Sequence, residues 1–139
     1  MHKIGALVKI LFIFIISFTY VNANEINDKA ALNGIKEAKS VFLIDFTNVK
    51  KTAFYLNIIE GTHKGFVSQG VKPDMVLVFI GETVKYLSTK PDEAFEMENE
   101  EDLISIQKSI KTLASLGVRM EVCAVATKVF NVDNSTIPK

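Results

Sequence analysis

The sequence is poor in several residue types, and each shortage excludes a class of protein. A single cysteine among 139 residues excludes an intramolecular disulfide and a metal site built from cysteines alone. Sixteen basic and sixteen acidic side chains leave no net charge, which argues against a protein that holds nucleic acid on a basic face. Seven glycines and three prolines are too few for a collagenous or low-complexity chain. The length suits one globular domain.

The longest apolar run lies near the amino terminus and has the pattern of an export signal. Residues 10–18 read ILFIFIISF, lysines precede this run, and a short polar stretch ending in Ala23 follows it. A basic start, a short apolar run and a small final residue are the three parts of a secretory signal peptide. The alternative is an uncleaved membrane anchor, which needs about 20 apolar residues. This run is shorter, and Lys9 prevents its extension toward the amino terminus. We therefore expect cleavage after Ala23, a periplasmic location and no membrane association after cleavage.

Cleavage changes the composition of the functional chain. Removing 23 of the 139 residues leaves 116, and the loss of two lysines leaves 14 basic against 16 acidic side chains, a formal charge of −2. A mildly acidic protein is a poor ligand for nucleic acid or for an anionic membrane. We expect three segments: a signal peptide at 1–23, a polar leader at 24–39 and one α/β domain at 40–139.

Apolar runs in the domain predict the strands of a parallel sheet, because parallel strands are buried on both faces. Apolar residues at helical spacing separate these runs. A strand–helix–strand–helix–strand order indicates a flavodoxin-like three-layer fold with helices on both faces. Three strands are few for this fold, so we expect a last strand beyond Lys139 or partner subunits that cover the sheet. The expected elements are strands at 41–44, 75–80 and 118–125, helices at 49–68 and 100–116, a third helix starting between 124 and 126, a short helix or ordered loop at 82–88, and an irregular stretch at 91–98.

Cys123 is the strongest candidate for a catalytic residue. Ligands of open α/β sheets bind at the carboxyl ends of the strands, and Cys123 lies near the end of the third expected strand, just before a helix start. A thiol at a helix amino terminus is stabilised as thiolate by the dipole and the free amides, and thiolate is the form that attacks sulfur electrophiles. The alternative is a structural cysteine, since Val-Cys-Ala-Val is apolar and cysteine packs well as a small hydrophobe.

Other polar residues at the strand ends are weaker candidates. Asn48, Gly81 and Glu82 follow the first two strands and form the expected ligand-binding set, although Asn48 is also a competent helix cap. Asp45 is expected to cap backbone amides, and His63 is expected at the surface or at a helix end. We expect no cofactor and no metal, because the sequence has no GxGxxG or Walker motif and its acidic stretch lacks EF-hand spacing.

Four segments of the sequence resemble a known family. They read KSVFLIDF at 39–46, FYLNII at 54–59, VLVFIG at 76–81 and LGVRMEVCAVATKVF at 116–130. Together they are similar to the DsrE/DsrF-like family and, more narrowly, to its exported members. The resemblance implies a flavodoxin-like fold with a five-stranded parallel sheet, assembly as a homo-oligomer and a role in sulfur relay. Cys123 matches the position of the relay cysteine, which carries a persulfide.

One departure from the family concerns the carboxyl terminus. Exported members usually continue past an Ile-Pro pair like Ile137-Pro138 into a further strand rich in glycine and tyrosine, which this sequence does not contain.

The sequence leaves three functional hypotheses open. The first is a sulfur carrier or sulfurtransferase-like protein that uses Cys123, with sulfur donor and acceptor proteins as partners. The second is a non-catalytic oligomeric binding or assembly module in which Cys123 is buried. The third is a redox protein whose Cys123 forms a disulfide between two chains.

Overall fold

The structure is a computed structural model that describes residues 28–138. The expected signal peptide at 1–23 lies outside the described residues. The chain divides into two units, one up to Ala31 and one from Leu32 onward. The short helix α2 (Lys29–Leu32) spans this division, and the other helices and strands of the described residues belong to the second unit.

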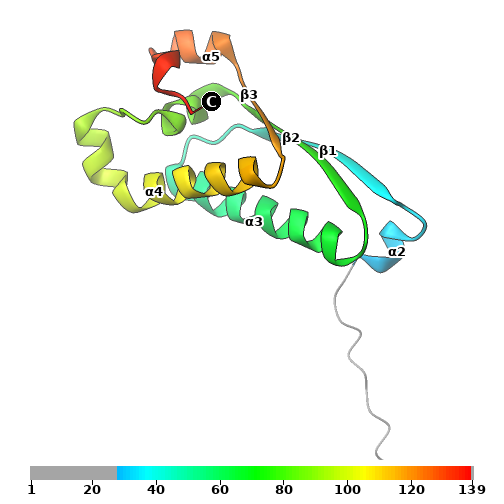
Figure 1. The fold of residues 1–139 in the computed structure, drawn as a ribbon. Coiled ribbons are helices and arrows are strands. Elements are labelled where there is room, and N and C mark those ends of the chain that lie inside the picture. The colour runs from blue at the N-terminus through cyan, green and yellow to red at the C-terminus, as the bar shows by residue number, and fades with distance from the viewer. Residues whose placement is uncertain (1–27, 139) are drawn as a thin grey trace, which may run out of the picture. The chain divides into compact units, whose positions relative to one another are not determined.

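Three parallel strands form the sheet (Figure 1). They are β1 (Glu37–Ile44), β2 (Lys72–Phe79) and β3 (Arg119–Val122), in the spatial order β1-β2-β3. In the register, Val41 lies beside Val76 and Phe79 lies beside Val122. The predicted α/β class with a parallel sheet is therefore confirmed, in agreement with a flavodoxin-like fold.

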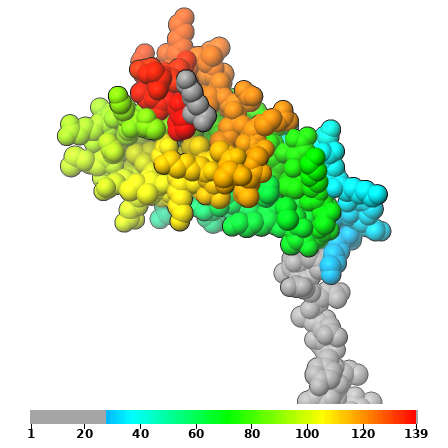
Figure 2. Space-filling model, viewed as in Figure 1, coloured from blue at the N-terminus to red at the C-terminus, as the bar shows by residue number. Residues whose placement is uncertain are grey.

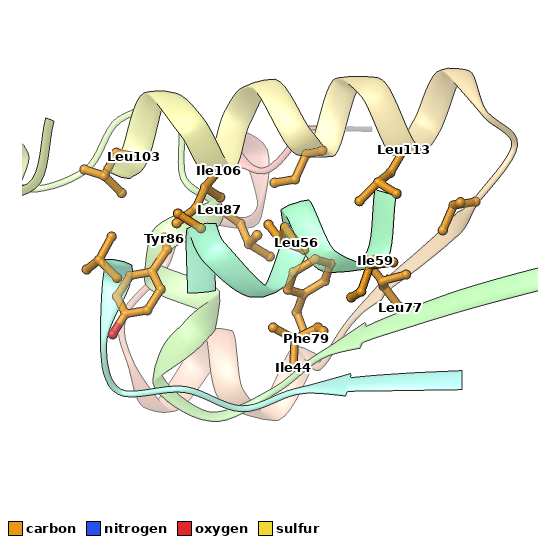
Figure 3. Close-up of a cluster of buried hydrophobic side chains, with 14 of the residues drawn as sticks. Ile44, Leu56, Ile59, Leu77, Phe79, Tyr86, Leu87, Leu103, Ile106 and Leu113 are labelled. Atoms are coloured by element: carbon orange, nitrogen blue, oxygen red, sulfur yellow. The ribbon is translucent and has the colours of Figure 1, made fainter. Parts of the chain in front are cut away.

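Two long helices connect the strands. Helix α3 (Val49–Ser68) has the predicted bounds, and Asn48 caps it by accepting a hydrogen bond from the Lys51 amide at 2.8 Å. Helix α4 (Glu93–Ser115) leads from β2 to β3. Because successive right-handed crossovers advance across the sheet in one direction, both helices lie on the same face (Figures 1 and 3).

The core fills the space between these helices and one face of the sheet (Figure 3). Alternate residues of the strands point into it, and apolar residues three or four apart on each helix meet them. Each fully buried aliphatic side chain contributes on the order of 1.5–3 kcal/mol. The fully or almost fully buried members are Ile44, Leu56, Ile59, Leu77, Phe79, Tyr86, Leu87, Ile106 and Leu113.

The described residues leave the opposite face of the sheet uncovered. Val41 is 70% exposed and Leu43 is 58% exposed, although both lie within a parallel strand. Their neighbours Val76 and Val78 are half-buried. Helices are expected on both faces of a three-layer fold, whereas both long helices of the described part cover the same face.

Shorter elements complete the carboxyl end of the sheet. They are the 3-10 helix η1 (Gly81–Leu87), the helix α5 (Ala124–Val129) and the 3-10 helix η2 (Asn134–Thr136). The C-terminal segment is tied to the residues after η1, because the Thr89 amide donates to the Thr136 carbonyl at 2.8 Å. Figure 2 shows this segment in red, next to α5 in orange.

Several predicted boundaries are wrong for identifiable reasons. The stretch 91–98 is helical from Glu93, because Asp92 caps it by accepting hydrogen bonds from the Ala94 and Phe95 amides. Asn99, expected as the helix cap, lies instead at a kink inside α4, with φ −125° and ψ 19°.

Two further predictions fail at strand ends. Strand β1 begins at Glu37, so the end of the expected leader already belongs to the sheet. Strand β3 ends at Val122 because α5 begins at Ala124. A third wrong prediction concerns His63, which is buried at 8% exposure because it continues the core-facing stripe of Leu56 and Ile59.

Candidate functional site

Cys123 lies at the junction between β3 and α5. Its amide donates a hydrogen bond to the Phe79 carbonyl at 3.0 Å, which extends the β2–β3 pairing by one residue. Its carbonyl accepts a hydrogen bond from the Thr127 amide at 3.0 Å, which closes the first turn of α5. The main chain is therefore held on both sides, while the residue is partly exposed and its side chain makes no capping hydrogen bond.

Thr83 joins the ends of β1 and β2. Its hydroxyl accepts a hydrogen bond from the Phe46 amide at 2.7 Å and donates one to the Phe46 carbonyl at 3.0 Å. Thr83 is fully buried, so this pair of bonds fixes η1 against the loop after β1. Thr83 was not predictable from the sequence, because its partner is 37 residues away in the chain and no local pattern signals that contact.

Gly81 has a structural reason to be glycine. Its φ is +57°, in the left-handed region that favours glycine. A Cβ atom at this position would overlap with Oδ1 of Asp45, whose carboxylate lies directly against the Gly81 backbone. The ends of β1 and β2 therefore approach so closely here that no larger residue fits without displacing Asp45.

The remaining predicted ligand residues have partners within the protein. The side chain of Asn48 caps α3, and Glu82 forms an ion pair with Lys85 on η1. Lys85 also lies over the ring of Phe95, 5.6 Å from its centroid. The fold places these residues at the carboxyl end of the sheet, but their polar groups are already used.

Two titratable groups near this end have shifted pKa values. Burial, followed by the negative charge of Glu82, raises the pKa of Tyr86 to about 12. The Tyr86 ring stacks on Phe95 with centroids 5.8 Å apart. Hydrogen bonds from Ser135 lower the pKa of Asp133, which caps η2.

Two cavities lie near the site, and Cys123 lines neither of them. One of about 210 Å³ lies beside Val122 and Ala124, the neighbours of Cys123, and reaches Pro138. Another, of about 320 Å³, lies beyond the end of α5 and is lined by both charged and aromatic side chains, among them Lys90 and Phe130.

The described part of the chain contains neither a candidate metal cluster nor a helix suited to span a membrane. No group of three or more His, Cys, Asp or Glu side chains there is placed to hold a metal ion. None of its helices has the length and hydrophobicity required to cross a membrane.

The fold is a flavodoxin-like α/β fold, because helical crossovers join the strands of a parallel sheet. Its single cysteine is partly exposed after β3, at the carboxyl end of that sheet. Residues 38–138 match the DsrE/DsrF-like family, and the chain belongs to that family. Comparisons with curated proteins and with solved structures gave no match. Membership points to a role related to sulfur relay, and Cys123, Gly81 and most of the elements described here lie inside the matched region.

Proposed function

We propose that this protein carries sulfur as a persulfide on Cys123. One observation carries the proposal: Cys123, the only cysteine of the chain, is a partly exposed residue at the carboxyl end of a parallel sheet, where ligands of such sheets bind. The family assignment supports the same role, because the matched region includes this residue.

The chemistry consists of two exchange steps, each with its own thiolate nucleophile. The Cys123 thiolate attacks the terminal sulfur of a donor persulfide, so a new S–S bond forms on Cys123 and the donor departs as its thiolate. An acceptor thiolate then attacks the outer sulfur, and Cys123 leaves as thiolate. Each step breaks one S–S bond and forms another, so no external oxidant or reductant is consumed.

The surroundings of Cys123 suit a negatively charged sulfur. The side chain lies at the amino end of α5, where the first amide groups of a helix point outward and favour negative charge. The thiol of Cys123 makes no capping hydrogen bond at this end, so these amides remain available to a persulfide on the same side chain.

We place the mature protein in the periplasm as a homo-oligomer that exchanges sulfur with donor and acceptor proteins. The apolar run at 10–18, with lysines before it, supports export. The uncovered face of the sheet supports association between chains.

Intact mass measurement after incubation with inorganic polysulfide tests the proposal. We expect the native protein to gain the mass of sulfur, and Cys123→Ser to gain none. A matched control moves the thiol along the same helix: Val129 is 66% exposed, so Cys123→Ser/Val129→Cys presents an accessible cysteine away from the helix start. We expect slower loading of that variant. No adduct on the native protein, or equal loading of the control, would contradict the proposal.

An assembly module with a structural cysteine is the second candidate, and the partial burial of Cys123 favours it. It predicts that folded protein resists alkylation at Cys123 until denaturant unfolds it. Rapid alkylation of the folded protein would exclude this candidate. An interchain disulfide on non-reducing electrophoresis would instead support a redox role.

A further inference from the structure

The side of α3 that faces away from the core carries an apolar line. Four residues at helical spacing form this line: Phe54, Ile58, Gly61 and Gly65. Phe54 is 65% exposed and Ile58 is 45% exposed, and both lie opposite the buried Leu56. A surface helix ordinarily carries polar or charged residues on this side, so the line indicates an apolar contact outside the chain.

Lysines flank the apolar line on both of its sides. Lys50 and Lys64 follow one side and Lys51 the other, and all three are exposed. Among the described residues, none of the three forms an ion pair. Lys51 lies over the Phe46 ring, 6.0 Å from its centroid, and keeps its charge. Glu60 is the only acidic residue of α3, and it is half-buried, so the outer side of this helix is basic as well as apolar.

The adjoining part of α4 extends this surface. Both helices lie on the same face of the sheet, so their outer sides point the same way (Figures 1 and 3). On α4 that side carries Ile104, which is 61% exposed, together with the exposed Lys108 and Lys111. The acidic residues of α4 all precede Leu103. The formal charge of −2 on the chain from residue 24 onward therefore coexists with a basic outer surface on the helical layer.

We propose that this outer surface, centred on the apolar line of α3, binds an anionic lipid membrane. Phe54 and Ile58 enter the boundary between headgroups and acyl chains, and the flanking lysines contact the headgroup phosphates. The net charge of the chain predicted no membrane association. Attraction to a charged surface acts over only about 10 Å, however, so the charges of the contacting side decide it.

The shape of the surface favours a membrane over a partner protein. The strongest contacts between proteins are side chains that fill pockets, whereas a bilayer accepts protruding side chains without a pocket. The cavities at α4, at η1 and after β3 are lined by no residue of α3. The uncovered face of the sheet lies on the other side of the molecule, so association there does not compete with a membrane. The inference does not depend on the chemistry of Cys123.

Flotation with lipid vesicles tests the proposal. The chain from Asn24 onward is the suitable form, because it lacks the apolar run at 10–18 and retains the compact unit from Leu32 to Lys139. We expect it to float with vesicles that contain equal parts of phosphatidylcholine and phosphatidylglycerol. Binding to phosphatidylcholine alone should be more than about tenfold weaker, and about 0.5 M salt should release the protein.

Paired lysine variants test the electrostatic contribution. Lys50→Gln/Lys64→Gln should lower the partition coefficient about 30-fold, or about fivefold for each lysine. Lys39→Gln/Lys128→Gln removes the same charge from exposed positions on β1 and α5, and should change the coefficient less than about threefold.

Paired apolar variants test the insertion of side chains. Phe54→Gln/Ile58→Gln should weaken binding about tenfold or more, and its circular dichroism spectrum should stay native because both residues are exposed. Val125→Gln/Val129→Gln is the matched control, since these residues are 71% and 66% exposed on α5, and it should bind as the native chain does.

Tryptophan fluorescence reports which side enters the membrane, because the chain contains no tryptophan of its own. The emission of Phe54→Trp should shift to shorter wavelength with anionic vesicles and should be quenched by brominated lipid. The emission of Val129→Trp should do neither.

Three results would overturn the proposal. They are no flotation with anionic vesicles at low salt, equal losses for the two paired lysine variants, and a larger shift for Val129→Trp than for Phe54→Trp. A chain that does not float, but forms a dimer that Phe54→Gln/Ile58→Gln weakens, would identify a second copy as the occupant and would also overturn it.

Discussion

Replacing Gly81 with alanine tests how the carboxyl end of the sheet is built. Alanine has to adopt the φ of +57°, and its Cβ atom has to displace the carboxylate of Asp45. The left-handed conformation costs an L-residue about 1–2 kcal/mol, of which roughly 0.4–1 kcal/mol is offset by the loss of glycine's freedom in the unfolded chain. Moving the Asp45 side chain from its rotamer costs about 0.5–1.5 kcal/mol more. We expect Gly81→Ala to lower the free energy of unfolding by about 1–2.5 kcal/mol.

A double-mutant cycle followed by urea denaturation separates the two contributions. Asp45→Ala removes the overlapping carboxylate, so Gly81→Ala should cost about 1 kcal/mol less in that background than in the native chain. Gly65→Ala is the matched control, because Gly65 lies inside α3 and a Cβ atom added there would meet nothing within 4 Å. There we expect a gain of about 0.5–1 kcal/mol.

Two results would refute this reasoning. If Gly81→Ala were as stable as the native protein, backbone conformation would not explain this glycine. If its cost were the same with and without Asp45, the close approach of the two strand ends would not contribute.

Three further changes probe the same end of the molecule. Thr83→Val should lower the free energy of unfolding, measured by urea denaturation, by about 2–3 kcal/mol, because it leaves the amide and carbonyl of Phe46 without a hydrogen-bond partner. The control Thr62→Val on α3 should lower it by under about 1 kcal/mol. Asn48→Ala should lower the free energy of unfolding by about 1 kcal/mol, because α3 loses its cap, and should leave sulfur loading of Cys123 unchanged in mass measurements. Slower sulfur loading of this variant would instead support Asn48 as a ligand-binding residue. The pKa of Tyr86 is raised to about 12, so the stability due to its neutral form is complete below pH 10 and declines as pH rises toward 12. In thermal melts between pH 10 and 12, Tyr86→Phe should lose less stability than the native protein, and Tyr55→Phe should lose as much as the native protein. Equal losses for the two variants would contradict the contribution of Tyr86.

The helix that follows β1 was predictable because all its signals are local. Asn48 supplies a cap, the segment contains no proline, and its apolar residues repeat at helical spacing. The first two turns of α4 escaped prediction because their side chains are mostly exposed, so no buried stripe marks them. Only the Asp92 cap signals the start, and the acidic residues around it also suit a loop.

The residues predicted for the site lie near the carboxyl ends of the strands, but their roles depend on contacts that the sequence does not show. Ligands of parallel sheets bind at the carboxyl ends of the strands. This rule requires only the order of strands and helices, so it selects Cys123 and Gly81 without information about the side chains around them. The capping by Asn48 and the overlap at Gly81 depend on where side chains lie after folding. Thr83 illustrates the limit, since a threonine that joins two loops looks like any other threonine in a sequence.

The backbone hydrogen bonds at Cys123 make its Cα a fixed pivot. One bond anchors it to β2 and the other to α5, and neither restrains rotation about the Cα–Cβ bond. A persulfide would extend this side chain by one further bond of about 2 Å, so its outer sulfur would sweep an arc over the sheet edge without any movement of the main chain. A donor and an acceptor could therefore approach from different directions and each meet the same sulfur atom in a different rotamer.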